Sequence, residues 1–104
     1  MSVISVYAVF RDADEAERIG HMVVEERLSA CVNINGSIRS IYRWNGAIES
    51  ANEVAAIFKT TEARADALIT RIAELHSYEV PCIVSWPIDR ILGPYADWVE
   101  DSIG

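Results

Sequence analysis

The sequence has few positive charges. Nine lysine and arginine residues stand against sixteen aspartate and glutamate residues, which gives a net charge of −7 at neutral pH. Nucleic acids and anionic membranes are bound by clustered basic side chains, so this balance argues against both as partners. An acidic surface favours cations as ligands and helps to keep a protein soluble.

Long apolar runs and a secretion signal are also missing. No segment reaches the about 20 apolar residues that a membrane-spanning helix needs. Residues 1–7 lack the basic stretch and the cleavage site of a signal peptide, and they have the pattern of a β-strand instead. We therefore expect no membrane partner.

Cysteine is scarce, and the usual catalytic motifs are absent. Cys31 and Cys82 are far apart and form no CxxC pattern. The simplest expectation is that both are buried free thiols, because unpaired cysteine is among the most buried residue types. The sequence has no glycine-rich phosphate loop, no HExxH helix and no nucleophile elbow, so these motifs indicate no enzyme class.

The sequence does contain a regular succession of strand and helix patterns. Its 104 residues predict a single domain, residues 1–104, whose small core is naturally supplemented by association with further copies. The order β-α-β-β-α-β plus a short helix predicts an α+β, ferredoxin-like split βαβ fold, an antiparallel sheet with two helices on one face. Strand patterns cover residues 3–10, 31–44, 47–60 and 82–86, and helix patterns cover residues 12–28, 61–75 and 95–102.

The two central strands predict an unusually long hairpin. Asn45–Gly46 is a strong signal for a tight turn, and each arm approaches fifteen residues, whereas strands average about 5–6. The distal half carries Ile41, Tyr42, Trp44 and Ile48, which the helices are too short to cover. We expect an exposed apolar ribbon that another subunit covers.

The segment from His76 to Pro81 brings several side chains capable of proton transfer or metal binding close together in the sequence. It joins a helix pattern to a strand pattern and carries an imidazole, a phenol and a carboxylate. Alternate residues of an extended segment share a face, so His76 and Tyr78 are expected together and Glu79 on the opposite side. Glu79 then forms either a salt bridge with Lys59 or an arginine, or part of a site.

Several strings, in this order and spacing, resemble the CutA family of divalent-cation tolerance proteins. The resemblance runs from about Val3 to Trp98. The strings are Ala30-Cys31-Val32-Asn33, Ser40-Ile41-Tyr42-Arg43-Trp44-Asn45-Gly46-Ala47-Ile48-Glu49, Glu53, Lys59-Thr60, His76-Ser77-Tyr78-Glu79-Val80-Pro81, Pro87-Ile88 and Tyr95-Ala96-Asp97-Trp98.

This resemblance implies a PII-like homotrimer in the cytoplasm, linked to tolerance of copper and other divalent metals and not known as an enzyme. It predicts a protein that binds copper, another divalent cation or a small ligand at clefts between subunits. The alternative is a PII-like small-molecule-sensing regulator or scaffold with no physiological metal. An enzyme using His76 and Tyr78 as acid and base is a third hypothesis, for which the sequence offers no nucleophile.

The chain departs from the family pattern around the His76–Pro81 segment. Ser77 stands where the family has proline, which frees an N–H group and predicts a looser turn. Cys82 stands where a glutamate is usual. Ala8 and Leu75 occupy positions at which some members carry a cysteine and a second histidine, so the copper ligands described for the family are incomplete here.

Two sets of candidate site residues follow. The candidate ligands for Cu(2+) or another divalent cation are His76, Cys82, Cys31 and Glu79, whose side chains suit such ions. His76 has the alternative role of a hydrogen-bonding group at a helix C-terminus. The candidate cleft residues are Tyr42, Trp44, Lys59, Tyr78 and Trp98, for which the alternative is packing at a subunit interface.

Overall fold

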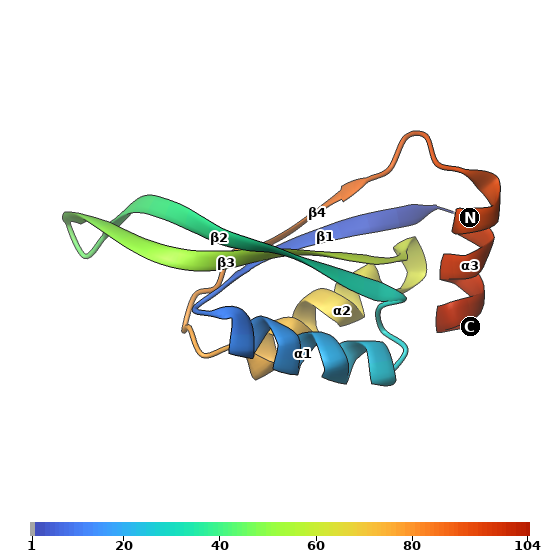
Figure 1. Ribbon diagram of the computed structural model, residues 1–104, viewed down its shortest axis with the longest axis horizontal. Helices are drawn as coiled ribbons and strands as arrows, with labels where there is room; N and C mark the ends of the chain where they lie inside the picture. The colour runs from blue at the N-terminus through green and yellow to red at the C-terminus, as the bar shows by residue number, and fades with distance from the viewer. Residues whose placement is uncertain (1) are drawn as a thin grey trace.

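The computed structural model describes residues 2–104 as a four-stranded antiparallel sheet in the order β2-β3-β1-β4, with α1 and α2 on one face (Figure 1). The elements are β1 (Val3–Phe10), α1 (Ala13–Glu25), β2 (Cys31–Trp44), β3 (Ala47–Thr61), α2 (Glu62–Leu75), β4 (Ile83–Pro87) and α3 (Gly93–Ile103). The ferredoxin-like α+β prediction is confirmed. None of the helices in this described range is long and apolar enough to cross a membrane.

The main core lies between the sheet and the two helices. Alternate residues of β1 and β3, among them Val6, Phe10 and Phe58, are fully buried against the apolar stripes of α1 and α2. Gly20 brings α1 close to the sheet, because a Cβ atom at this position would lie 2.8 Å from Cγ1 of Val32. Close packing of helix on sheet thus explains a glycine inside a helix.

Helix α1 begins as its sequence predicts. The Asp12 side chain accepts a 2.9 Å hydrogen bond from the Glu15 N–H, which satisfies a free amide of the first turn. Thr61 occupies the N-cap position of α2, but its side chain makes no capping hydrogen bond. At β4 the strand begins at Ile83, one residue later than predicted, and includes Pro87 at the edge of the sheet.

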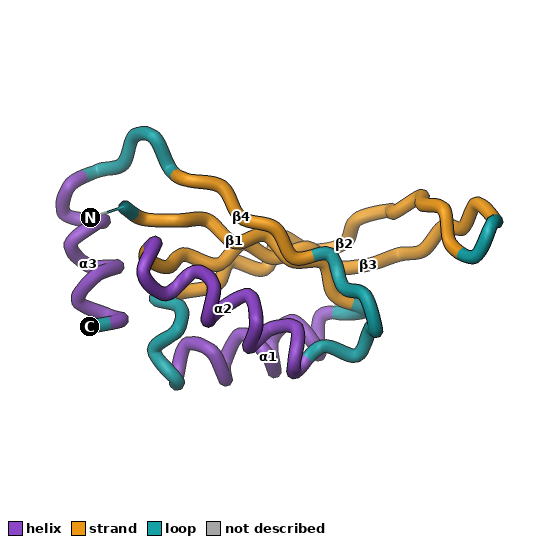
Figure 2. Tube along the Cα trace, turned by 180° about the vertical axis from the view of Figure 1, so that it is seen from behind, coloured by secondary structure: helices purple, strands orange, loops and turns teal. Residues whose placement is uncertain are grey.

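The β2–β3 ribbon extends far beyond the helices. The register shifts between Ile34 and Gly36, and the turn has φ angles of 50° at Asn45 and 81° at Gly46, as the expected bulge and tight turn require. Pairing of β1 with β3 ends at Phe10, so the distal ribbon has only two strands (Figure 2). The predicted exposed ribbon is therefore present.

Helix α3 lies at the opposite end of the molecule from the ribbon tip (Figure 1). Its Val99 and Ile103 pack with Val3 and Ala30 in a second, smaller apolar cluster. Pro94 occupies the first turn of this helix, where a missing N–H costs nothing. The long axis of the molecule thus separates two chemically distinct ends.

Candidate functional site: the corner and its cavity

The imidazole of His76 contacts two aromatic rings and makes two hydrogen bonds. Its ring stacks on Phe10 with centroids 5.1 Å apart and meets the ring of Tyr78 at 4.8 Å. The Tyr78 N–H donates to Nδ1 at 3.0 Å, so the ring proton lies on Nε2, which donates to the Val9 carbonyl at 2.8 Å. Both nitrogens of His76 are therefore engaged in structural hydrogen bonds.

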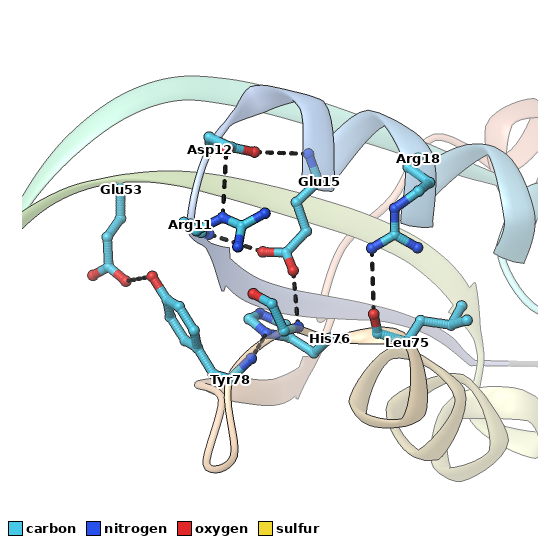
Figure 3. A network of polar contacts seen from close by, with 9 residues as sticks. Arg11, Asp12, Glu15, Arg18, Glu53, Leu75, His76 and Tyr78 are labelled. Carbon is cyan, nitrogen blue, oxygen red and sulfur yellow. Dashed lines mark hydrogen bonds and ion pairs between the residues drawn. The ribbon is translucent and has the colours of Figure 1, made fainter.

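Residues 76–82, which connect α2 to β4, form a corner of the fold. The buried carboxylate of Glu15 anchors this corner to α1 (Figure 3). Glu15 is 3% exposed, and its two oxygens accept the N–H of Arg11 at 3.0 Å and the N–H of Ser77 at 2.8 Å. Burial raises the pKa of Glu15, but hydrogen bonds from Ser77 and Arg11, with the nearby His76, outweigh it and hold this pKa below its usual value.

Ser77, which stands where the family has proline, makes a backbone hydrogen bond that proline is unable to make. A proline at this position has no N–H and is unable to donate to Glu15. The freed N–H of Ser77 was expected to loosen the turn, whereas the structure uses it to tie the corner to the buried carboxylate. The N–H group that proline removes is therefore hydrogen-bonded here, while the looser corner stays a prediction.

Tyr78 connects the corner to the root of the distal ribbon. Its hydroxyl donates a 2.7 Å hydrogen bond to Oε2 of Glu53, which is 8% exposed (Figure 3). Burial, this hydrogen bond and the negative charge of Glu53 together raise the pKa of Tyr78 well above its ordinary value. Tyr78 is thus a neutral phenol that donates its proton to the Glu53 carboxyl group in a hydrogen bond.

Between the corner and the ribbon lies a cavity of about 750 Å³. Strand β2 contributes Tyr42 and Trp44 to its wall, and the corner contributes Tyr78, Glu79 and Cys82. The result is an aromatic hollow with a few polar groups, the usual character of a ligand site.

The candidate metal ligands are not gathered in one place. Glu79 and Cys82 line the cavity, while both nitrogens of His76 are occupied. Cys31 lies toward α3, with Sγ 3.5 Å from the hydroxyl of Tyr95. Among residues 2–104, no three histidine, cysteine, aspartate or glutamate side chains are placed to hold a metal ion.

The prediction of two buried cysteines is wrong for Cys82, which is exposed. Its alternating strand pattern suggested a place in β4, but that strand begins at Ile83, and Cys82 belongs to the corner that borders the cavity. Cys31 is half-buried. Its contact with Tyr95, together with burial, raises the pKa of Tyr95 to about 12.

The candidate cleft residues divide into two groups within one chain. Tyr42, Trp44 and Tyr78 meet at the cavity. Lys59 is paired with Cys31 far along β3, and Trp98 on α3 stacks on the ring of Tyr95 with centroids 5.7 Å apart. The expected Lys59 partner for Glu79 is therefore distant. A cleft that joins both groups requires more than one chain.

Three residues of these networks were not among the sequence candidates: Glu15, Glu53 and Tyr95. Glu15 was read only as an acidic residue of a first helical turn. Glu53 carried a usable signal, because it is a carboxylate at the start of an otherwise buried stretch of strand. Tyr95 belonged to one of the family strings, but its position in a terminal helix did not indicate a contact with Cys31.

Comparison with protein families finds a match over nearly the whole chain. The family described as CutA1 divalent ion tolerance protein matches residues 4–102. The divalent-cation tolerance protein CutA of Thermotoga maritima is 40% identical over 101 residues, which cover 97% of this chain and 99% of that protein. Human protein CutA is 37% identical over 99 residues, covering 95% of this chain and 55% of its own length.

Solved structures show the same fold. CutA from Xylella fastidiosa superposes with a TM-score of 0.97 at 33% identity and full coverage of both chains. A protein of Archaeoglobus fulgidus, described as a periplasmic divalent cation tolerance protein CutA, superposes with a TM-score of 0.95 at 36% identity, covering 98% of this chain and 99% of its own. These likenesses bear out the family resemblance found in the sequence strings.

Proposed function

Since this chain belongs to the family of CutA1 divalent ion tolerance proteins, we propose that it is a trimeric divalent-cation tolerance protein of the cytoplasm. The observation that carries the trimer is the apolar surface of the distal ribbon. Ile41 is 73% exposed and Ile48 is 63% exposed. Strand surfaces of this kind are stable in water when another subunit covers them.

The trimer is tested by measuring the mass of the particle in solution. Light scattering after size-exclusion chromatography is expected to give three times the 11.6 kDa of one chain. The double substitution Ile41→Ser and Ile48→Ser is expected to reduce this mass, and Val24→Ser, on the exposed side of α1, is the matched control. A single-chain mass for the unmodified protein at every concentration would overturn the trimer.

The second part of the proposal is that a divalent metal ion or a small ligand binds where subunits meet. Of the four candidate ligands only Glu79 and Cys82 line the cavity, and among residues 2–104 of one chain no three such side chains are placed to hold a metal ion. A copper or zinc ion there needs further ligands from a neighbouring copy. Thiolate and carboxylate are suitable donors for such an ion.

Calorimetric titration with copper(II) and with zinc tests this metal site. We expect Cys82→Ala to weaken binding at least about tenfold, the loss typical of a direct ligand or its support. His76→Ala is expected to have a small effect, since both nitrogens already have partners, and exposed His21→Ala serves as the control. Equal binding by all four proteins removes Cys82 as a ligand.

The alternative is a PII-like regulator or scaffold without a physiological metal. The aromatic cavity favours it, because a hollow of this volume accepts an organic molecule more readily than a lone ion. A thermal-shift screen of metabolites on metal-free protein is expected to give a stabilising hit. A flat response to metabolites alongside a strong response to copper argues for the metal.

The role proposed here is binding in the cytoplasm, without catalysis. His76, the best general base among the candidates, has no nitrogen left for proton transfer. Both cysteines are unpaired, as is usual in a reducing compartment. Cell fractionation tests the location, and recovery in the periplasm, the compartment in the description of the Archaeoglobus protein, would contradict it.

A further inference from the structure

We infer that the cavity between the distal ribbon and the corner binds a small organic cation, an alkylguanidinium or alkylammonium ion, against the rings of Tyr42, Trp44 and Tyr78. This inference deepens the small-ligand part of the proposed function and rests on it for the biological role of the site. It names the chemical class of the ligand, which the family relationship leaves open.

The first argument is shape. A volume of about 750 Å³ lies within the roughly 300–1,000 Å³ of small-molecule sites. Its aromatic walls come from two segments, Tyr42 and Trp44 from β2 and Tyr78 from the corner. A cation over the face of such rings is attracted by their electron density, and tryptophan is the best of them.

The second argument is the charge on the cavity side of the ribbon. Alternation along the strands places Ser40, Tyr42 and Trp44 on one face, and pairing adds Glu49 and Glu53 to it, opposite Tyr42 and Ile38. The carboxylates that line the cavity itself are Glu53 and, from the corner, Glu79. Negative side chains next to aromatic rings favour a positively charged ligand.

The two arginines that border the cavity belong to the other face of the ribbon. Arg39 pairs with Asn52 and Arg43 with Ile48, the alternate positions of the same ladder. The guanidinium of Arg39 is held there by hydrogen bonds to Asn52 at 3.0 Å and to Ser50 at 3.1 Å. The charge of Arg39 is therefore held by neighbouring polar groups, and the Arg43→Gln substitution tests whether the charge of Arg43 opposes a cation in the cavity.

The third argument is hydrogen-bonding direction. The only hydroxyl hydrogen of Tyr78 is donated to Glu53, so its oxygen is left to accept. Carboxylates only accept as well. A ligand between Tyr78 and Glu79 must therefore bring donors, which an ammonium or guanidinium group has and a carboxylate group lacks.

The experiment is a calorimetric titration of the full chain with butylguanidinium, N-butylurea and butyrate. Butylurea has the shape and the N–H donors of butylguanidinium without its charge. We expect butylguanidinium to bind at least about tenfold more tightly than butylurea, in the range of a desolvated cation–π contact, and butyrate not to bind. Equal affinity for the two isosteres, tighter binding of butyrate, or no binding of butylguanidinium overturns the inference.

Four substitutions locate the ligand. Trp44→Leu is expected to weaken butylguanidinium binding about tenfold, while Trp86→Leu, at a tryptophan outside the cavity with similar exposure, leaves it unchanged. Glu79→Gln is expected to weaken it about threefold without touching the aromatic wall. Arg43→Gln is expected to leave binding unchanged or tighten it, so a loss there contradicts the assignment of faces.

The outcome for this site is separate from the outcome for the proposed function. Light scattering reports the trimer, and copper titration reports the metal, independently of butylguanidinium. Loss of organic-cation binding in an intact, metal-binding trimer removes this inference alone. A cavity filled by a neighbouring copy shows itself as no butylguanidinium binding by the assembled protein, and it also overturns the inference.

Discussion

The two halves of the β2–β3 ribbon have similar chemistry and opposite surroundings. In the proximal half of β3, Phe58 and Ala56 are fully buried beneath the helices. In the distal half, Ile48 on the same strand is 63% exposed, and Ile41 on the neighbouring strand β2 is 73% exposed. The paired strands β2 and β3 thus run from the buried core of the chain to an exposed apolar surface.

This difference shows where the chain completes its own structure and where it does not. The proximal half is covered by α1 and α2. Helix α1 packs closely on the sheet at Gly20 and is hydrogen-bonded to the corner through Glu15. The distal half has only its partner strand and the corner beside it. Isolated two-stranded ribbons are marginal in water, and the distal half is therefore where we propose that a second subunit packs.

The largest expected effect lies in the proximal half. Phe58→Ala removes a fully buried ring between sheet and helices and is expected to lower the free energy of unfolding by about 3–5 kcal/mol. Urea denaturation followed by far-UV circular dichroism measures this loss. A cost below about 1 kcal/mol would show that the proximal core is not the stabilising part of the ribbon.

The next effect concerns the carboxylate that joins α1 to the corner. Glu15→Gln is expected to cost about 1.5–3 kcal/mol at neutral pH, because two backbone N–H groups lose an ionised acceptor. The matched control is Glu17→Gln, at an exposed position on the same helix.

The pH dependence of this effect follows from the lowered pKa of Glu15. A carboxylate whose pKa is lower in the folded state stabilises the fold above its unfolded pKa of about 4.3, and this contribution is lost as pH falls through the folded value. The difference in stability between the unmodified protein and Glu15→Gln should therefore shrink below about pH 4. A difference that is constant from pH 7 to pH 3 contradicts the assignment.

A smaller effect tests the closeness of α1 to the sheet. Gly20→Ala places a Cβ atom against the stiff side chain of Val32, and the resulting overpacking of about 1–3 kcal/mol outweighs the gain of about 1 kcal/mol in helix propensity. We expect a net loss of about 1 kcal/mol in thermal or urea unfolding. In a Val32→Ala background the same change should become stabilising, and a loss there as well argues against this contact.

The smallest effect on a single chain is expected in the distal half. Ile48→Ser should change the free energy of unfolding by less than about 0.5 kcal/mol in dilute protein, since its side chain is mostly in solvent. At high concentration the same substitution should lower the unfolding midpoint if a second copy covers the ribbon. A large loss that is independent of concentration would place Ile48 in the chain's own core.

The order of the elements and the two turns were predictable because their signals are local. A continuous run of apolar residues marked β1, Asp12 marked the start of α1, and Asn45–Gly46 marked the hairpin. The exposed ribbon was predictable because the two strands of the hairpin are too long for the helices to cover along their whole length. The exposure of Cys82 was not predictable, because the strand boundary lies one residue away from the predicted one. Strand β4 begins at Ile83, and Cys82 therefore lies in the corner.

The candidate site was foreseen in part. The segment from His76 to Glu79 lies between a helix and a strand as predicted, and Tyr42, Trp44 and Tyr78 line one cavity, while their role as site residues stays a prediction. The grouping of His76, Cys31, Cys82 and Glu79 as metal ligands stays a prediction that needs a second chain, since no such cluster forms among the described residues of one. Residue types suggest ligands, whereas only geometry shows which lone pairs are already in use.

The sequence by itself determined the family, the α+β plan and the presence of an apolar ribbon that needs covering, because periodicity, turn residues and ordered motifs act over short distances. The tertiary structure decided which side chains meet. Ser77 reaches Glu15 across 62 positions of the chain, and Tyr78 reaches Glu53 across 25. These contacts depend on how the sheet, the helices and the corner pack, and that packing determines that His76 is a structural residue and that the cavity presents aromatic rings and hydrogen-bond acceptors.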